Sequence, residues 1–492
     1  MEHNRKFLSS RSSEIGRFSN LPKEVLYHIL SHLPIKDLAR FCCVSKPCRE
    51  LSLATPSVRI YGFDGDEKPD MSTCELRLKL VNALDRFLLS RGDNKMWVFD
   101  LVWEGHSEDE VEEPPCFCVN ESFRMITWIQ NAVRCQVEKL RLDITFYDYE
   151  GERLEFPSCV FRCASLRSLV VEMSFTVVAT PSFAFSSNLE NLELSDVDIE
   201  DEGFFKWISC SCKLLKKLAL ARLNGINNIT IESLSLEYIF FINFHLEETC
   251  HINISGEKLE EININCSYSP RSTVLNIVAP NAKSLMLVGN VKNNLNLGEL
   301  ECLQVASILM EPIVDDFDKV FEVLCSLCSV QSLSLNEATI KAAYGEETMH
   351  MHAQLDEIWD LHMNNGSFTD ELVPAVVSLL KGTPNLCTLY MSYKPTLLDP
   401  KSNTSGFDMG YWKKQKLAFI SQVEYVTIEL SAGSNGIELA RYILEHAETL
   451  ENMVIRYLPH QSNVKRKLKK SKTMSNATVT FEEYQRSVHP LG

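Results

Sequence analysis

The chain has 492 residues, of which 45% are hydrophobic and 23% charged, and these fractions are ordinary for globular proteins. Its 49 Lys and Arg against 66 Asp and Glu give a formal net charge of −17. A wholly disordered or collagen-like chain is excluded, and the length predicts several domains or one long repeat array. Because no apolar run approaches the roughly 18 to 20 residues that cross a bilayer, we expect no membrane partner. The polar first residues lack the apolar core of a secretory signal, so we expect the 17 cysteines to be free thiols.

The charge is unevenly distributed along the chain. Residues 1–50 carry a net +4 and residues 460–492 a net +5, which leaves −26 on the part between them. Nucleic-acid affinity comes largely from Lys and Arg that neutralise phosphates. We therefore expect no nucleic-acid partner and no polyphosphate or other cofactor.

Residues 20–53 predict a head of three short helices. Leu21, Val25 and Ile29 recur every four residues, and further leucines beside them make an apolar stripe wider than one small neighbour covers. Pro34 ends the first helix, and Pro47 suits the first turn of the third. Three helices of this size bury little surface by themselves, so the head is expected to need a partner.

This head resembles the F-box, the module by which substrate receptors bind the Skp-family adaptor of Skp-cullin-F-box ubiquitin ligases. The resemblance implies that adaptor, and through it a cullin, as partners. One departure is Cys48, where the family usually has Trp. The other reading is a helical cap that seals the apolar end of the next domain. The candidate adaptor-binding residues are Leu21, Pro22, Val25, Leu26, Ile29, Leu30, Leu33, Pro34, Leu38 and Val44.

A pattern of apolar-x-x-apolar-x-apolar recurs through the body, about 26 residues apart, which lies within the leucine-rich-repeat range of roughly 20 to 29. Alternation of the last two apolar residues predicts a strand with one face inward, followed by a return segment. The thirteen predicted copies are Val137/Leu140/Leu142, Leu166/Leu169/Val171, Leu189/Leu192/Leu194, Leu215/Leu218/Leu220, Ile231/Leu234/Leu236, Leu259/Ile262/Ile264, Ala282/Leu285/Leu287, Leu300/Leu303/Val305, Val330/Leu333/Leu335, Ile358/Leu361/Met363, Leu386/Leu389/Met391, Val423/Val426/Ile428 and Leu450/Met453/Ile455.

The predicted fold class is α/β: a three-helix F-box followed by an irregular leucine-rich-repeat solenoid with parallel strands on its concave face. Before the first copy, alternating Trp97, Phe99 and Leu101 predict an opening strand. The acidic run Glu104 to Pro115 is read as a solvated loop, and Ser122 to Val133 as an amphipathic return helix. A final strand is expected near Ala477 to Phe481.

Further stretches resemble the plant F-box/leucine-rich-repeat family with a C-terminal FBD domain. They are Phe156-Pro157-Ser158 with Leu166, Trp207 to Leu220, Ala279-Pro280-Asn281, and the strand-helix-strand segment Phe419 to Ile455. The predicted domains are a flexible N-terminus over 1–16, the F-box over 17–55, the solenoid over 56–410, an FBD-like C-terminal repeat unit over 411–484 and a tail over 485–492.

The sequence predicts no catalytic and no metal-binding residues. Glycine-rich phosphate loops, the Gly-x-Ser-x-Gly motif and the His-Glu-x-x-His motif are all missing. Cys325 and Cys328 have metal-like spacing with His350, His352 and His362 nearby, but they sit in an apolar run, which favours core packing over zinc. We therefore expect no enzyme.

The outward residues of consecutive strands predict where a protein substrate binds, because the concave face of a solenoid is extended. The candidate substrate-binding residues are Arg141, Glu193, Asn263, His362 and Tyr390. Most residues on such a face are ordinary solvated side chains. Reception of a small ligand is an alternative that needs an apolar pocket with convergent polar groups.

Together these features predict the substrate-recognition subunit of a Skp-cullin-F-box ubiquitin ligase, acting on an unknown protein. The alternative is a leucine-rich-repeat scaffold, adaptor-bound or free, with no role in ubiquitination. The basic run over 465–472 is read as an import signal, a partner contact or a solvated loop. We expect the protein in the nucleus, the cytoplasm or both.

Overall fold

The computed structural model divides the chain into two compact units, Met1–Ile226 and Asn227–Gly492, which are described in turn. The described residues are 21–62, 71–104, 121–145, 153–242, 250–266, 273–289, 294–298, 300–311, 317–327, 329–344, 355–393, 406–431, 433–461, 464–469, 471 and 473–483.

The first unit begins with three short helices, α2 (Lys23–Ser31), α3 (Ile35–Cys42) and α4 (Lys46–Leu53). Pro22 and Pro34 occupy the N-cap positions of α2 and α3. The hydroxyl of Ser45 caps α4 by accepting a hydrogen bond from the Cys48 amide at 3.3 Å. The predicted helical head is therefore present, with its proline punctuation at the helix starts.

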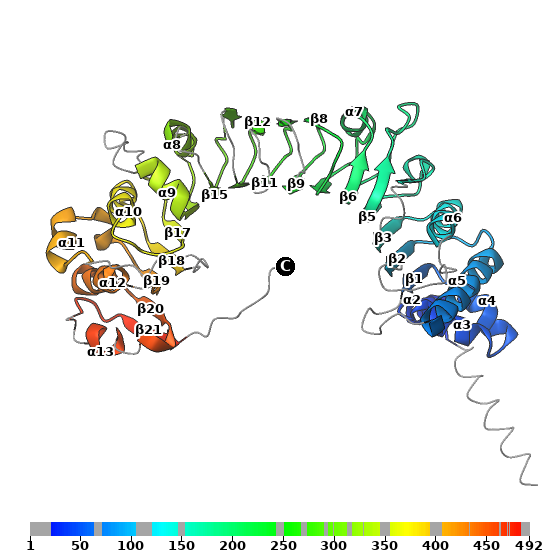
Figure 1. The fold of residues 1–492 in the computed structure, drawn as a ribbon, viewed down its shortest axis with the longest axis horizontal. Coiled ribbons are helices and arrows are strands. Elements are labelled where there is room, and N and C mark those ends of the chain that lie inside the picture. The colour runs from blue at the N-terminus through cyan, green and yellow to red at the C-terminus, as the bar shows by residue number, and fades with distance from the viewer. Residues whose placement is uncertain are drawn as a thin grey trace, which may run out of the picture. The chain divides into compact units, whose positions relative to one another are not determined.

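Parallel strands follow the head in the order β1, β2, β3, β5, β6, β7, and two-residue β4 pairs with the end of β5 (Figure 1). Their side chains alternate between buried and half-exposed, as the repeat pattern predicts. The elements of this part are β1 (Ser57–Tyr61), α5 (Met71–Arg91), β2 (Val98–Glu104), α6 (Glu121–Arg134), β3 (Lys139–Thr145), β4 (Leu154–Glu155), a 3-10 turn (Val160–Arg162), β5 (Ser168–Val178), β6 (Asn191–Ile199), α7 (Gly203–Ser211) and β7 (Lys217–Ala221).

A buried ion pair connects helices α5 and α6 of this unit to strand β2. Arg77 of α5 donates to both carboxylate oxygens of Glu121 at the start of α6, at 2.6 and 2.8 Å. The indole of Trp103 on β2 donates to the same carboxylate at 2.9 Å. Because each polar group here has a partner, the charges are tolerated among apolar neighbours.

The main sheet of the second unit is also parallel, in the order β9, β11, β13, β15, β16, β17, β18, β19, β20, β21. Its strands are β9 (Tyr238–Ile242), β11 (Glu261–Cys266), β13 (Ser284–Gly289), β15 (Val305–Met310), β16 (Ser332–Asn336), β17 (Asp360–Asn365), β18 (Thr388–Tyr393), β19 (Tyr425–Glu429), β20 (Asn452–Tyr457) and β21 (Thr478–Glu483).

The length of a repeat decides whether its return segment in this unit is a strand or a helix. Ile239, Ile262 and Leu285 share one cross-strand row and belong to short repeats, whose return segments are strands that form a second parallel sheet. Its members are β8 (Asn228–Glu232), β10 (Cys250–Ser255), β12 (Thr273–Val278) and β14 (Asn294–Asn296), in the order β8, β10, β12, β14. Because a strand rises farther per residue than a helix does, a return strand covers the same distance with fewer residues.

The later repeats are longer, and helices cover one side of their strands (Figure 1). Leu333, Leu361 and Leu389 share a row and are more widely spaced along the chain than Ile239, Ile262 and Leu285. The helices are α8 (Phe317–Cys325), α9 (Glu337–Tyr344), α10 (Leu372–Lys381), α11 (Met409–Gln415), α12 (Asn435–His446) and α13 (Val464–Leu468), with 3-10 turns at Ala418–Ser421 and Pro459–Gln461. The other side of β16–β21 is called the open face below.

Two predicted repeat registers are wrong, and the strands of the second sheet and the first strand of the sheet in the first unit were missed. Leu234 is 72% exposed, and the buried pair on the neighbouring main-sheet strand is Ile239 and Phe241. Val305 is 46% exposed, because β15 buries Ala306 and Ile308 instead. That first strand is β1, which precedes β2 and pairs with it. The correct register of β15 was not recognised, because its middle pattern position is Ala306 and not a large apolar residue.

The other predicted registers are confirmed as the buried positions of β3, β5, β6, β7, β11, β13, β16, β17, β18, β19 and β20. The final strand is β21, the opening strand lies within β2, and the return helix is α6. The segment Phe419 to Ile455 forms a strand, a helix and a strand, as expected. The acidic loop lies outside the described residues beyond Glu104. The α/β class with an F-box head and a parallel repeat sheet is confirmed. In the described ranges, no helix is both long and apolar enough to span a membrane.

Candidate functional site

An apolar stripe on the helical head is exposed beside the described residues of the first unit. The exposed fractions of Leu21, Val25 and Ile29 are 38%, 42% and 40%, and the three residues are four apart, so they lie on one side of α2 and its approach. Val44 after α3 is 61% exposed. Pro22 and Pro34 are exposed, and Leu33 is half-buried. Isolated exposed apolar residues are common, but an aligned stripe marks an interaction surface.

Three of the candidate adaptor-binding residues do not belong to this surface. Leu26, Leu30 and Leu38 are 3%, 1% and 0% exposed, so they hold the head together and cannot contact a second protein in this conformation. The sequence could not separate the two groups, because Leu26 and Val25 are neighbours on a helix that is apolar on most of its circumference. The burial of Leu26 also means that its substitution would unfold the head rather than test docking.

The head also packs on the repeats, as the capping reading expected. Helices α2 and α3 contact β1, the first strand of the sheet in this unit, and α4 contacts α5. The head therefore buries one side on its own chain and leaves the stripe of Leu21, Val25 and Ile29 open. The side of the head that packs on the repeats and the exposed stripe are therefore different sides of the same module.

The candidate substrate residues fall into separate places. In the first unit, Arg141 on β3 lies 3.5 Å from the carboxylate of Asp143, and Glu193 on β6 accepts a hydrogen bond from Asn191 at 3.0 Å. In the second unit, Asn263 lies on β11 between Phe240 and Met286. Within the first unit, Arg141 and Glu193 lie in one cross-strand row with Val170 of β5 between them.

His362 and Tyr390, by contrast, are in contact. They are cross-strand partners on β17 and β18, and their rings lie 5.3 Å apart with 33° between the ring planes. His362 Nε2 also lies 3.2 Å from the carboxylate of Asp360, which accepts a hydrogen bond from the Ser332 hydroxyl at 2.7 Å. Asp360 and Ser332 thus hold the His362 side of this tilted pair in place.

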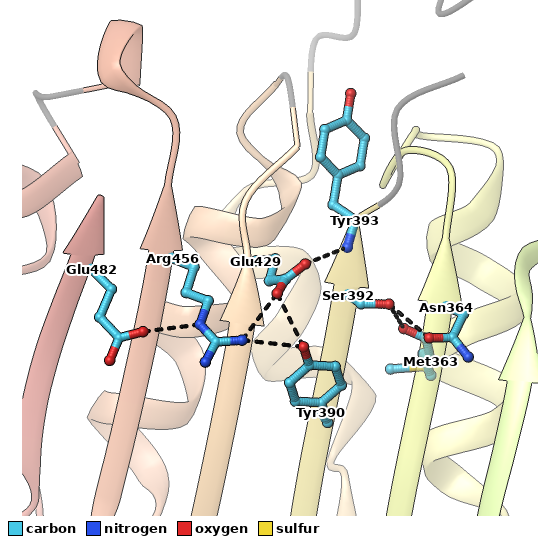
Figure 2. A network of polar contacts seen from close by, with 8 residues as sticks. All are labelled: Met363, Asn364, Tyr390, Ser392, Tyr393, Glu429, Arg456 and Glu482. Atoms are coloured by element: carbon cyan, nitrogen blue, oxygen red, sulfur yellow. Dashed lines mark hydrogen bonds and ion pairs between the residues drawn. The ribbon is translucent and has the colours of Figure 1, made fainter. Parts of the chain in front are cut away.

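Beyond Tyr390 a charged network crosses the open face (Figure 2). Arg456 on β20 donates to Glu429 on β19 at 3.1 Å and to Glu482 on β21 at 2.9 Å. The Tyr390 hydroxyl donates to Glu429 at 3.0 Å, and Arg456 also reaches that hydroxyl at 3.2 Å. The second oxygen of Glu429 accepts from the Tyr393 amide at 3.0 Å. The Tyr390 hydroxyl, Glu429 and Arg456 are each held by at least two partners.

Hydrogen bonds also continue the network toward β16. The Ser392 hydroxyl donates to Asn364 Oδ1 at 2.7 Å, as Figure 2 shows, and Asn364 donates to Ser334 at 3.1 Å. Polar contacts therefore span the open face from β16 to β21. Such a preformed, rigid face costs little conformational entropy when a partner binds.

Charge and burial shift several ionisation equilibria here. The hydrogen bond to Asp360 raises the pKa of His362 above its ordinary value. Burial opposes ionisation of Asp360, but hydrogen bonds from His362 and Ser332 outweigh it and lower the pKa of that carboxyl. Hydrogen bonds to Glu482 and Glu429 raise the pKa of Arg456, which is therefore permanently charged.

A signal for this network was present in the repeats. Glu429, Arg456 and Glu482 each directly follow the last apolar residue of a strand, and they share one cross-strand row. Aligning the repeats on their apolar residues would have placed the three side by side. The prediction of substrate-binding residues rests on single outward residues such as Tyr390. It does not use the cross-strand rows that connect such residues.

Nothing in the described part of the chain points to a metal site. No group of three or more His, Cys, Asp or Glu side chains is placed to hold an ion there. Cys325 is exposed at the end of α8, while Cys328, His350 and His352 lie outside the described residues. Burial raises the pKa of Cys212 to about 12, which makes that thiol unreactive at neutral pH.

Comparisons with known proteins agree with this architecture. The family model for the F-box domain matches residues 18–56, and a model for the LRR repeats of the FBD-associated F-box protein At5g56370 matches residues 125–314. The Arabidopsis thaliana F-box/FBD/LRR-repeat protein At4g03220 is 23% identical over 90% of this chain and 89% of its own length. The Arabidopsis FBD-associated F-box protein At5g22730 is 22% identical over 89% of the chain and 87% of its length.

A helical F-box head and a parallel repeat sheet define the class: an F-box protein with leucine-rich repeats, the kind of protein that recognises substrates for other enzymes. Relatives along nine-tenths of the chain narrow this class further. Along most of its length the chain is similar to plant F-box/leucine-rich-repeat proteins that carry an FBD region, as the resemblance predicted. F-box domains generally bind Skp adaptors. The predicted domain boundaries remain predictions.

Proposed function

We propose that this protein is the substrate-recognition subunit of a Skp-cullin-F-box ubiquitin ligase. The exposed stripe of Leu21, Val25 and Ile29 binds the Skp adaptor, and the adaptor connects the protein to a cullin. The repeats bind the target protein and hold it near a ubiquitin-charged enzyme, so that proximity accelerates transfer. No catalytic group of the protein's own is required for this role.

The observation that supports this proposal best is the exposure of the stripe on a head that is otherwise well packed. Burying a Val, Leu or Ile side chain contributes about 1.5 to 3 kcal/mol, so leaving three aligned apolar residues in water forgoes several kcal/mol. A head that served only as a cap for β1 would carry polar residues at these positions.

The test is binding to a purified Skp-family adaptor by isothermal titration calorimetry. We expect the double variant Val25→Asp, Ile29→Asp to lose binding by more than about a hundredfold, since two charges would enter an apolar interface. The control is Leu89→Asp on α5, which places one such charge at a residue 71% exposed elsewhere in this unit. Equal affinities of the double variant and the wild type would refute the proposal.

We also propose that the protein resides in the nucleus, the cytoplasm or both. Lys465, Arg466 and Lys467 are exposed on α13, while Val464 and Leu468 are buried and anchor it. If this helix is read as an import signal, changing the three basic residues to Ala reduces the nuclear fraction of a fluorescent fusion severalfold. An unaltered nuclear fraction would leave α13 as a solvated surface or a partner contact.

A further inference from the structure

The open face of the last repeats carries more carboxylates than cations. Among the strand residues of β16–β21 on this face, the acidic side chains are Asp360, Glu429 and Glu482, and the lone cationic one besides His362 is Arg456. Arg456 already donates to two of the carboxylates (Figure 2). Its charge is therefore compensated, and the surplus on this face is negative.

The surplus of negative charge favours a partner segment with a positive net charge. A phosphorylated or acidic segment needs unpaired Arg or Lys groups, and the described strands of this face offer none. A segment rich in Lys or Arg, by contrast, finds carboxylate acceptors whose positions are already fixed. Such complementary charges favour association of the segment and set its orientation on the face.

A second feature lies beside this network, at the carboxyl ends of β17–β19. Asn365 is only 4% exposed, and its Oδ1 atom accepts no hydrogen bond from any described residue. A buried carbonyl oxygen without a donor is costly and rare. Asn365 lines a small hollow that has room for a group the size of a water molecule, together with Phe368, Met391, Ile428 and Glu429.

The lining of the hollow specifies what would fill it. Phe368, Met391 and Ile428 form an apolar wall, and the oxygens of Asn365 and Glu429 are acceptors on the polar side. An ammonium group is compact and carries three donors, whereas a guanidinium is a wider planar fork. The ammonium group of a lysine matches the size of the hollow and suits the two acceptors, while its methylene stem stays outside.

We propose that the open face of β17–β21 binds an extended, lysine-bearing segment of the target protein, with one ammonium group donating to Asn365 and Glu429. The inference rests on the proposed function, in which the repeats hold the target. The remaining lysines of the segment lie near Asp360 and Glu482. The target is recognised in its unphosphorylated form.

The probe is a fluorescein-labelled peptide of alternating serine and lysine, about ten residues long, which spans five strands spaced roughly 4.8 Å apart. Binding to the full chain is measured by fluorescence anisotropy at physiological salt. We expect the lysine peptide to bind, a matched arginine peptide to bind about five times more weakly, and a matched glutamate peptide not to bind. Equal binding of the glutamate peptide would overturn the proposal.

Variants then locate the site on the molecule. Glu429→Gln keeps an oxygen that accepts from the Tyr393 amide but removes the charge, and we expect it to weaken lysine-peptide binding about tenfold. Asn365→Asp adds a charge at the hollow and is expected to tighten binding. The control Glu438→Gln removes the same charge from α12, where Glu438 pairs with Arg441 at 3.2 Å. Equal weakening by Glu438→Gln would show non-specific attraction and would contradict the proposal.

Adaptor binding is measured on the same variants to separate the two proposals. We expect Glu429→Gln to bind the Skp adaptor with wild-type affinity, because the change lies far along the chain from the F-box stripe. Failure of every peptide together with intact adaptor binding overturns the lysine site alone. Failure of the wild-type chain to bind any adaptor overturns the proposed function, and the peptide result then stands by itself.

Discussion

Asp360 and His362 form a titratable pair on the open face. The hydrogen bond between them raises the pKa of His362 and helps to lower that of Asp360. Because the folded pKa of the histidine is raised, its stabilising contribution is complete below the unfolded value of about 6.5 and is lost as the pH rises through the folded value. The pair therefore weakens as the pH rises through the raised pKa of His362, and it weakens again in acid as the pH falls through the lowered pKa of Asp360.

A titration of His362 by NMR tests this coupling. We expect its midpoint above about 6.5 in the wild-type chain and a return toward the ordinary value in Asp360→Asn, which removes the negative charge. Ser332→Ala serves as the control, since it removes the other partner of Asp360 and leaves the His362 contact in place. An unchanged midpoint in Asp360→Asn would show that the 3.2 Å contact does not govern the histidine.

Glu121 is the most consequential buried charge of the first unit. Its carboxylate binds the Arg77 guanidinium and the Trp103 indole, and the side chains of Glu121 and Arg77 are only 11% and 10% exposed. Removing one partner of such a pair leaves the other charged and unpaired, at a cost of about 3 to 5 kcal/mol.

We therefore expect Glu121→Ala to lower the free energy of unfolding of the first unit by about 3 kcal/mol. Urea unfolding followed by tryptophan fluorescence measures the change, because Trp103 and Trp128 pack within this region, with ring centroids 5.8 Å apart. Glu104→Gln, at the exposed end of β2, is the control. A loss below about 1 kcal/mol would mean that the pair behaves as a surface salt bridge.

At the scale of elements, the helical head has a packing side and a docking side. Leu26 and Leu30 are buried against its other helices, while Val25 and Ile29 remain exposed. We expect Leu26→Ala to cost about 2 to 5 kcal/mol of head stability, because it leaves a cavity, whereas Val25→Ala changes stability by less than about 0.5 kcal/mol.

Hydrogen exchange of α2 separates these effects from docking. Leu26→Ala is expected to accelerate amide exchange in Lys23–Ser31, and Val25→Ala to leave it unchanged while lowering adaptor affinity. If both variants exchange alike and bind the adaptor alike, the division of α2 into two sides is incorrect.

The repeat strands were largely predictable because one physical signal specifies them. Alternating apolar residues such as Leu361 and Met363 must share a buried face, and the spacing between copies repeats. The second sheet of β8, β10, β12 and β14 was not predicted, because short return segments such as Asn228–Glu232 carry the same alternation as a main-sheet strand. That ambiguity caused the wrong register at Leu234.

The open-face network was only partly predictable for a different reason. His362 and Tyr390 are recognisable as outward aromatic residues, but their neighbours come from adjacent repeats, a whole repeat length away along the chain. The contact between Arg456 and Glu429 depends on the exact pairing of two strands. A shift of one residue would turn either side chain toward the helices.

At the scale of the molecule, the head and the repeats differ in which of their apolar surfaces the chain covers. The repeats bury their apolar rows under helices or return strands and display polar rows outward. The head buries one side on β1 and leaves the stripe of Leu21, Val25 and Ile29 in water. The head therefore needs an apolar partner, and the open face of β17–β21 suits a polar one.

The alternative at this scale is a scaffold, adaptor-bound or free, with no part in ubiquitination. A free scaffold binds no adaptor, but an adaptor-bound scaffold does, so calorimetry with the adaptor alone does not separate the second form from a ligase subunit. They differ in whether the complex reaches a cullin inside the cell.

Co-precipitation of cullin with the tagged protein from plant cells tests the central claim most directly. We predict that cullin accompanies the wild-type chain and the Leu89→Asp control and that it is lost from the Val25→Asp, Ile29→Asp variant, with equal amounts of tagged protein recovered. Cullin that stays bound to the double variant, or that accompanies none of the three proteins, would contradict the account.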